Sequence, residues 1–254
     1  MTQDLLKGSN LTFSEDYLLG GRVLIRQPTT GYRVAIDPIF LAASIQAEAG
    51  ETVLDIGAGV GAASLCLAVR CPEVRVIGVE LHRESVRYAA DNIQLNNLRN
   101  RVEILHGDLL RSPPRLAAGT FSHVMTNPPY LDASSHNISP HETKAQSNLE
   151  GEASLEQWAR FCLLMVKPKG SITFIYRVDR LDYILGLFNG KLGNIKLYPL
   201  WPGQNKPAKR ILIQGTKNTH GALRLQPGMI LHQQKGAYTE EADQILRHAQ
   251  PIIW

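Results

Sequence analysis

The sequence has few cysteines: its 254 residues include three, Cys66, Cys71 and Cys162, and no two of them form a C-x-x-C pair. An odd number of cysteines without that spacing argues against a disulfide framework and against a zinc knuckle. No apolar run approaches the ~20 residues of a membrane-spanning helix. The N-terminal stretch MTQDLLKGSN also lacks the basic start, apolar core and small-residue cleavage site of a signal peptide. We therefore expect a cytoplasmic protein whose cysteines are core thiols.

Metal-ligand patterns are absent as well. The histidines His82, His106, His136 and His141 lack metal-site spacing, so no metal is expected. With 44% hydrophobic and 20% charged residues, the chain can bury a large core, which excludes a disordered or fibrous protein. Its formal net charge of +4 suits a polyanionic partner without requiring one.

Strand-like and helix-like segments alternate between about residues 50 and 190. The expected strands are 51–56, 75–80, 102–105, 121–127 and 170–176, and the expected helices are 61–70, 83–97, 155–166 and 180–189. Such alternation predicts a mostly parallel, doubly wound α/β sheet with helices on both faces. Two more strand-like runs, 195–200 and 210–214, are separated by a loop too short for a helical crossover, so they should pair antiparallel. The sequence thus predicts a seven-stranded mixed sheet whose last strand is antiparallel.

Two segments lie outside this alternation. Residues 1–48 predict a strand pair followed by a helix that starts near Asp37 or Pro38, because Asp can cap a helix and Pro suits its first turn. The polar stretch 131–153 has no periodicity, which is typical of a functional or disordered loop.

A glycine-rich turn follows the first strand of the alternation, in VLDIGAGVG. Gly57 and Gly59 let the backbone turn sharply and approach a ligand, and Glu80, at the end of the next strand, can accept two hydrogen bonds from a ribose diol. A NAD site satisfies the same glycine pattern. Asp55 favours another nucleoside cofactor, since a carboxylate suits an ammonium group better than a pyrophosphate. Asp108, in HGD, can accept from an adenine amine, or it can simply form a turn.

The tetrapeptide NPPY follows the fourth strand of the alternation, at the sheet edge where open α/β sheets bind ligands. Its prolines restrict the backbone, so that the Asn127 side-chain carbonyl and the Pro128 main-chain carbonyl can meet the two hydrogens of one NH2 group. Tyr130 offers a flat face for stacking. The plainer interpretation is a Pro-Pro loop with a surface tyrosine.

The motifs VLDIGAGVG, VIGVEL, HGD and NPPY, in this order and spacing, resemble those of class I S-adenosylmethionine-dependent methyltransferases that modify planar nitrogens. Over nearly the full length, the flanking segments GGRVLIRQPTTGYRVAIDPIFLAA, KPAKRILIQGTK and LHQQKGAYTEEADQIL resemble bacterial tRNA (adenine-N6)-methyltransferase-like proteins. The resemblance implies a Rossmann-like class I methyltransferase fold, S-adenosyl-L-methionine as cofactor and tRNA as partner. The extended C-terminal tail departs from the best-studied tRNA enzymes.

The resemblance also implies roles for particular residues. The methionine end of the cofactor would be bound by Asp55, Gly57 and Gly59, its ribose by Glu80, its adenine by Asp108, and the target amine by Asn127, Pro128 and Tyr130, with Asp37 near the reaction centre. It further implies an N-terminal segment 1–48 that contributes to the substrate site, a cofactor-binding domain 49–218, and a C-terminal extension 219–254 packed on that domain.

Basic residues gather near the predicted active edge. RNA contacts are expected from Lys206, Lys209 and Arg210, around the loop between the last two strands, and from Arg22, Arg26 and Arg33 near the entrance. Such a group is also compatible with an ordinary solvated face.

Other functions stay open at this stage. A protein glutamine-N5 methyltransferase would use the same NPPY tip, but that type usually carries a separate helical N-terminal domain, for which 48 residues are too few. The motifs do not exclude a guanine-N2 or small-molecule methyltransferase. A non-catalytic nucleoside-binding module is a further alternative, against which the intact NPPY argues.

Overall fold

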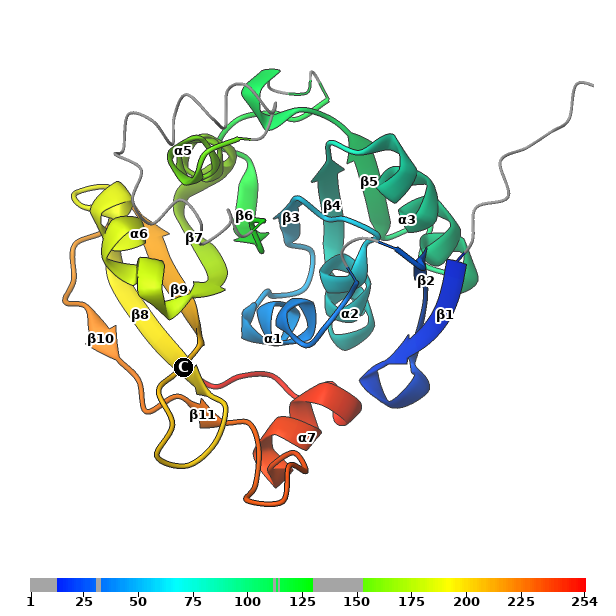
Figure 1. Ribbon diagram of the computed structural model, residues 1–254. Coiled ribbons are helices and arrows are strands. Elements are labelled where there is room, and N and C mark those ends of the chain that lie inside the picture. The colour runs from blue at the N-terminus through cyan, green and yellow to red at the C-terminus, as the bar shows by residue number, and fades with distance from the viewer. Residues whose placement is uncertain (1–12, 31–32, 112, 114, 130–152) are drawn as a thin grey trace, which may run out of the picture.

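A mixed sheet runs through the centre of the computed structural model, which describes residues 13–30, 33–111, 113, 115–129 and 153–254 (Figure 1). Its strands are β3 (Thr52–Ile56), β4 (Arg75–Glu80), β5 (Val102–His106), β6 (Phe121–Thr126), β7 (Val166–Arg177), β8 (Leu192–Trp201), β9 (Arg210–Lys217), β10 (Arg224–Leu225) and β11 (Met229–Ile230). They lie in the order β10-β8-β9-β7-β6-β3-β4-β5, and β11 also pairs with β8.

The strand directions confirm the predicted doubly wound topology. Strands β5, β4, β3, β6 and β7 are parallel, while β9 is antiparallel to both β7 and β8. The predicted strand number is wrong by two, because β10 and β11 extend the edge beside β8 and make the sheet nine-stranded. Each of these strands has two residues, which is too short to produce a period-2 pattern in the sequence.

Helices cover both faces of the sheet. One face carries α1 (Asp37–Ser44), α2 (Ala62–Arg70), α3 (Arg83–Leu95) and α7 (Glu240–His248), and the other carries α5 (Leu155–Met165) and α6 (Leu181–Phe188) (Figure 1). Neighbouring strand residues point to opposite faces, so Val53 belongs to the first apolar cluster and Leu54 to the second. Both side chains are fully buried, which explains why the strands read as nearly continuous apolar runs.

The helix starts follow from local sequence. Ser154 and Gln157 form a capping box at α5, in which the Ser154 hydroxyl accepts from the Gln157 N–H and the Gln157 side chain accepts from the Ser154 N–H. Helix α1 starts at Asp37, as predicted, with a proline in its first turn. Asp37 is the first helical residue and not the cap: Ile36 stands at the N-cap position and makes no side-chain cap, and the Asp37 carboxylate accepts a hydrogen bond from Arg210 of β9.

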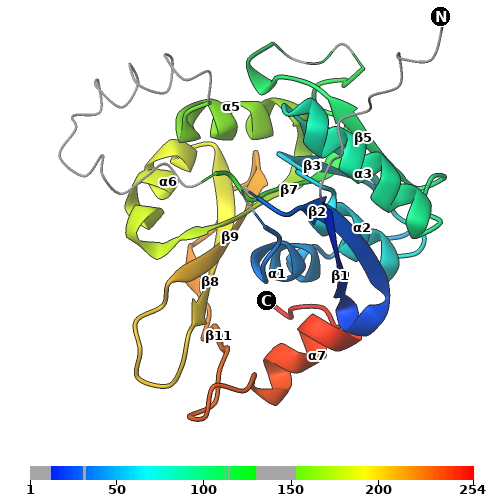
Figure 2. The same cartoon turned by 45° about the vertical axis from the view of Figure 1, so that its right-hand side comes forward.

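The chain before α1 forms the predicted strand pair. Strands β1 (Phe13–Leu18) and β2 (Val23–Pro28) pair antiparallel around the short helix η1 (Leu19–Gly21), apart from the main sheet. This hairpin packs on α3, and α7 lies below its turn (Figure 2).

The C-terminal segment packs on α1. The Ile252 N–H donates to the carbonyl of Ala43 at 2.8 Å, and the Trp254 indole N–H donates to that of Ser44 at 2.9 Å. The Trp254 ring also meets Tyr198 of β8 edge to face. These contacts fit the proposed C-terminal extension, whereas the domain boundaries at residues 48 and 218 stay predictions.

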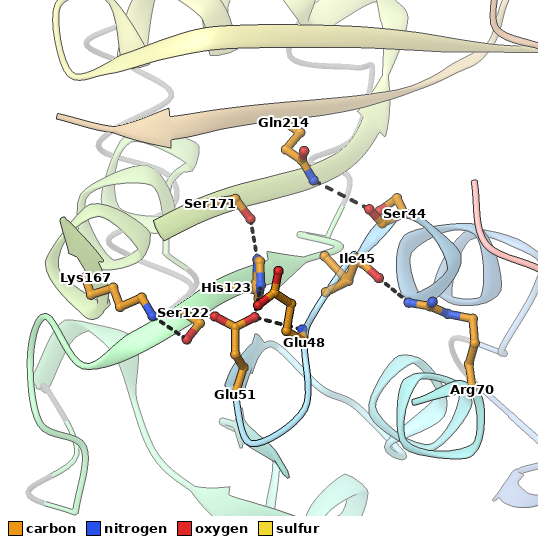
Figure 3. A network of polar contacts seen from close by, with 10 residues as sticks. All are labelled: Ser44, Ile45, Glu48, Glu51, Arg70, Ser122, His123, Lys167, Ser171 and Gln214. Atoms are coloured by element: carbon orange, nitrogen blue, oxygen red, sulfur yellow. Dashed lines mark hydrogen bonds and ion pairs between the residues drawn. The ribbon is translucent and has the colours of Figure 1, made fainter. Parts of the chain in front are cut away.

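A polar network ties the amino ends of the strands together (Figure 3). The Glu51 carboxylate, just before β3, accepts from the Glu48 N–H at 2.9 Å, meets His123 Nε2 at 2.9 Å and lies 3.5 Å from the Lys167 ammonium. The other ring nitrogen of His123 lies 2.7 Å from the Ser171 hydroxyl. Desolvation alone would raise the pKa of Glu51, but hydrogen bonds with Glu48, His123 and Ser122 and the electrostatic interaction with His123 outweigh it and lower the pKa to about 2.

We expect Glu51→Gln to remove a pH-dependent part of the stability. Because the folded pKa of about 2 lies below the ordinary glutamate value of 4.5, the carboxylate stabilises the fold above pH 4.5, and this contribution is lost as the pH falls toward 2. The variant should be about 1–2 kcal/mol less stable at pH 7, since the carboxylate is partly exposed and screened. Urea unfolding across a pH series measures the effect. Glu48→Gln, an exposed neighbour, is the control, and equal pH dependence in parent and Glu51→Gln would contradict the assignment.

Candidate functional site

Two motifs that lie 70 residues apart meet at the carboxyl edge of the sheet. Strands β3 and β6 are direct neighbours, with Ile56 opposite Thr126. The Thr126 hydroxyl donates to the Ile56 carbonyl at 2.8 Å. The glycine turn therefore begins beside Asn127. Since β4 lies on the other side of β3, this is the point where the strand order reverses, and open α/β sheets bind ligands at such points.

The glycine turn, residues 57–61, uses left-handed backbone at three positions: Gly57 at φ 73°, Gly59 at φ 56° and Gly61 at φ 89°. The N–H groups of Gly57 and Ala58 both donate to the Val79 carbonyl, at 2.8 and 3.0 Å. Gly61 then stands at the N-cap of α2. The turn is thus held against the end of β4.

The two predicted cofactor-binding glycines differ in their surroundings. A Cβ on Gly57 would overlap the Trp158 ring of α5, whereas a Cβ on Gly59 would meet nothing within 4 Å. Gly57 is therefore required by packing as well as by backbone angle. Gly59 leaves open space, which is compatible with close approach of a ligand.

Glu80 lies directly beside the turn. Its side chain is buried, with one carboxylate oxygen accepting from the Gly59 N–H at 2.9 Å and the other from the His82 N–H at 2.8 Å. Both donors are backbone N–H groups in the loops that follow β3 and β4. The structure brings Gly59 and Glu80 together, and their predicted binding roles stay predictions.

Asp55 lies under the same turn, 2% exposed. The Ser64 hydroxyl of α2 donates to its carboxylate at 2.7 Å. Desolvation raises the pKa of Asp55 to about 7; the Ser64 hydrogen bond opposes the rise and the charge of Glu80 adds to it. Asp55 is a buried acid without a positive partner among the contacts described, so a cationic group at this place would stabilise its charged form.

Asp108 takes the turn-forming position that the sequence allowed. Its carboxylate accepts from the Leu110 N–H at 2.8 Å and lies 3.8 Å from Arg111, in the short helix η2 (Leu109–Arg111). It nevertheless follows β5 beside Glu80, whose carbonyl accepts from the Gly107 N–H. Sequence reasoning missed two apolar side chains at these strand ends, Leu81 and Leu110, both more than 40% exposed. Leu81 follows the buried Glu80 and Leu110 lies two residues after the half-buried Asp108, an arrangement compatible with a planar ligand.

The tip after β6 is supported from β7. Asn127 is half-buried and Pro128 is buried, and the Tyr176 hydroxyl donates to the Pro129 carbonyl at 3.2 Å. Tyr176 itself is 2% exposed. Its support of the tip was not predicted, because nothing in the sequence near Tyr176 signals a partner 47 residues away. Tyr130 lies outside the described residues.

Two of the predicted substrate residues are joined to each other. Arg210, at the start of β9, binds the Asp37 carboxylate with Nε at 2.9 Å. Arg33 binds Asp16 of β1, also at 2.9 Å. These ion pairs leave the two arginines less available to phosphate than their sequence positions suggested.

The remaining basic residues divide into two groups. Lys206 and Lys209 are exposed on the loop between β8 and β9, at the carboxyl edge. Arg22, at the turn of the β1–β2 hairpin, donates to the His248 carbonyl, and Arg26 of β2 pairs with Glu15. The structure therefore does not gather all the nominated basic residues around one entrance.

The part of the chain that the structure describes has neither a metal cluster nor a membrane-spanning helix. Within the described ranges, no group of three or more His, Cys, Asp or Glu side chains could hold a metal ion. Among the helices described, none is long and apolar enough to cross a membrane.

Comparison with known proteins identifies related sequences and folds. The family model of the methyltransferase small domain matches residues 34–150. A Vibrio cholerae tRNA1(Val) (adenine(37)-N6)-methyltransferase is 25% identical over 233 residues, covering 88% of this chain and 90% of that protein. A Porphyromonas gingivalis protein of the same name is 28% identical over 227 residues, covering 85% and 88%.

Solved structures share the fold. The crystal structure of a predicted O-methyltransferase from Agrobacterium tumefaciens superimposes with a TM-score of 0.71 at 21% identity, covering 85% of this chain and 98% of that one. The TYW2 protein of P. horikoshii, in complex with MeSAdo, gives a TM-score of 0.54 at 14% identity, covering 85% and 75%. The fold is that of the class I methyltransferases.

Alanine substitutions at Gly57 and Gly59 should separate packing from backbone strain. Gly57→Ala should cost about 2–4 kcal/mol of folding stability, because it combines a left-handed residue with overpacking against Trp158. Gly59→Ala should cost only about 1 kcal/mol, since only the backbone term applies. Urea unfolding of both variants measures the difference. Equal losses would show that Trp158 does not constrain the turn.

Proposed function

We propose that this chain, whose fold is that of the class I methyltransferases, transfers a methyl group from S-adenosylmethionine to the N6 amine of an adenine in tRNA. The observation that carries the proposal is the meeting of the glycine turn and Asn127 at the ends of adjacent strands. The names of the relatives, which match over 85–88% of this chain, supply the substrate class.

The residues around the glycine turn fit the proposed cofactor. S-adenosylmethionine supplies an electrophilic methyl group on a sulfonium. Asp55 would face the ammonium of its methionine part, and a cation there would favour the charged form of a carboxyl whose pKa is about 7. The Glu80 carboxylate would accept from the ribose hydroxyls, and the space beside Gly59 would admit the ligand. Asp108 would accept from the adenine amine, between the exposed Leu81 and Leu110.

The tip after β6 would hold the acceptor amine. An aromatic amine is a weak nucleophile because its lone pair is delocalised into the ring. The Asn127 side-chain carbonyl and the Pro128 main-chain carbonyl would accept its two N–H groups and direct the lone pair toward the methyl group. These acceptors also stabilise the positive charge that develops on the nitrogen. No strong base is needed beforehand, since the amine becomes acidic only as it is alkylated. Stacking by Tyr130 stays a prediction.

Asp37 would act indirectly in this scheme. Its carboxylate is engaged by Arg210, so the pair joins the start of α1 to the start of β9 at the active edge. We assign Asp37 and Arg210 to shaping the acceptor side of the site. Phosphate binding falls to Lys206 and Lys209, which are exposed nearby.

Asn127→Ala tests the proposed reaction. It removes one acceptor of the amine without altering the cofactor side, so kcat should fall by ~10²-fold or more while S-adenosylhomocysteine affinity stays close to parental. Single-turnover methylation of tRNA, followed by digestion to nucleosides, measures both the rate and the formation of N6-methyladenosine.

The exposed Asn100→Ala is the matched control and should retain the parental rate. If Asn127→Ala methylates at the parental rate, the tip after β6 has a structural role only and does not bind the target amine. If the parent forms N2-methylguanosine, or methylates a protein glutamine and not tRNA, the proposed substrate is wrong.

Replacing Lys206 and Lys209 together with alanine should weaken tRNA binding and reduce its salt dependence. Each lost phosphate contact lowers the slope of log K against log salt by roughly one, so the double variant should lose about two. Binding at several salt concentrations measures the slope. Lys169→Ala, an exposed lysine where β7 begins near the amino edge, should leave it unchanged. A parental slope in the double variant would place the RNA surface elsewhere.

A further inference from the structure

Asn92 of α3 bridges two parts of the site that the sequence treats as separate. The side chain is completely buried. Its Oδ1 accepts from the Arg26 N–H of β2 at 2.7 Å, and its Nδ2 donates both to the Arg26 carbonyl at 2.9 Å and to the Val60 carbonyl at 3.0 Å. Both hydrogens of one amide group are therefore shared between the hairpin and the glycine turn.

Asn96, one turn later in α3, makes the same pair of hydrogen bonds to β2 as Asn92 but none to the glycine turn. Its Oδ1 accepts from the Leu24 N–H at 2.9 Å, and its Nδ2 donates to the Leu24 carbonyl at 2.7 Å. Its second hydrogen goes to the Asn92 carbonyl within the same helix, at 2.7 Å. Asn96 thus holds β2 in the same way but does not contact the glycine turn, which makes it an internal control.

Strand β2 in turn fixes the segment that leads to Asp37. Gln27, 2% exposed, accepts from the Val34 N–H at 2.8 Å and donates to Asp16 at 2.7 Å. Asp16 also binds Arg33. A shift of β2 at Arg26 would therefore move residues 33–37 and the ion pair between Asp37 and Arg210.

We propose that Asn92 is a positioning residue that couples cofactor binding on the glycine turn to the hairpin and to the acceptor-side segment 33–37. The coupling to tRNA rests on the proposed function. If the turn and β2 moved independently, one hydrogen of a buried amide would lose its partner, and a buried unsatisfied donor is costly. A ligand that stabilises the turn must then also stabilise the hairpin, and the effect is reciprocal.

The first test needs no RNA. In the parent, S-adenosylhomocysteine should slow amide hydrogen exchange at the Arg26 N–H, which Asn92 holds, as well as in the glycine turn. In Asn96→Ala, the ligand should still slow exchange at Arg26. In Asn92→Ala, it should protect the glycine turn only. Lack of ligand-dependent protection at Arg26 in the parent would overturn the proposal, even if the variant does not fold.

The second test uses tRNA. Saturating S-adenosylhomocysteine should tighten tRNA binding by the parent and by Asn96→Ala at least about fivefold, and should tighten binding by Asn92→Ala little or not at all. In methylation assays, Asn92→Ala should raise KM for tRNA more than it lowers kcat. If S-adenosylhomocysteine tightens tRNA binding equally in the two variants, Asn92 has a structural role only and the proposed coupling is wrong.

The two tests fail in different ways. If the parent does not bind tRNA, the proposed substrate is wrong, and the exchange at Arg26 still decides whether Asn92 couples the two regions.

Discussion

The turn between β3 and α2 is the constraint on which the site depends. Left-handed backbone at Gly57, Gly59 and Gly61 brings the chain back over the end of the sheet, and other residues adopt such angles only at a cost. The turn needs external support, because it has few hydrogen bonds of its own. The Val79 carbonyl and the Glu80 carboxylate supply that support, and both belong to the neighbouring strand β4. The shape of the glycine turn therefore depends on the parallel pairing of β3 with β4.

The two edges of the sheet shift the pKa values of their carboxylates in opposite directions. At the amino edge, hydrogen bonds and the electrostatic interaction with His123 lower the pKa of Glu51 to about 2, so the fold stabilises the anion. At the carboxyl edge, burial raises the pKa of Asp55 to about 7, so the fold destabilises the anion until a cation arrives. Perturbed acids of the second kind mark binding sites, because a ligand can supply the missing interaction. Our proposal places the chemistry at the carboxyl edge, where a cationic ligand group would stabilise the Asp55 carboxylate.

Helix α1 connects the active edge to segments far away in the chain. At its start, Asp37 is held by Arg210 of β9. At its end, the Arg70 guanidinium donates to the carbonyls of Ala42 and Ile45, and Ile252 and Trp254 of the C-terminal segment bind the last turn. Strand β9, helix α2 and the C-terminal segment therefore all contact the helix that carries Asp37. The C-terminal tail is thus connected through α1 to the sheet edge where Asp37 lies.

The sequence by itself determined the alternation of strands and helices, the antiparallel pairing of β8 with β9, the glycine turn and the tip after β6. Each is encoded in neighbouring residues through periodicity, loop length or backbone restriction. It could not reveal β10 and β11, which are too short to show a period. Nor could it reveal that Arg210 would bind Asp37, that Tyr176 would support Pro129, or that Asn92 would join Arg26 to Val60. These partners lie 173, 47, 66 and 32 residues apart, so no local pattern records them. Only the tertiary structure brings them within hydrogen-bond distance, because burial leaves each polar group no water to bind in place of its distant partner.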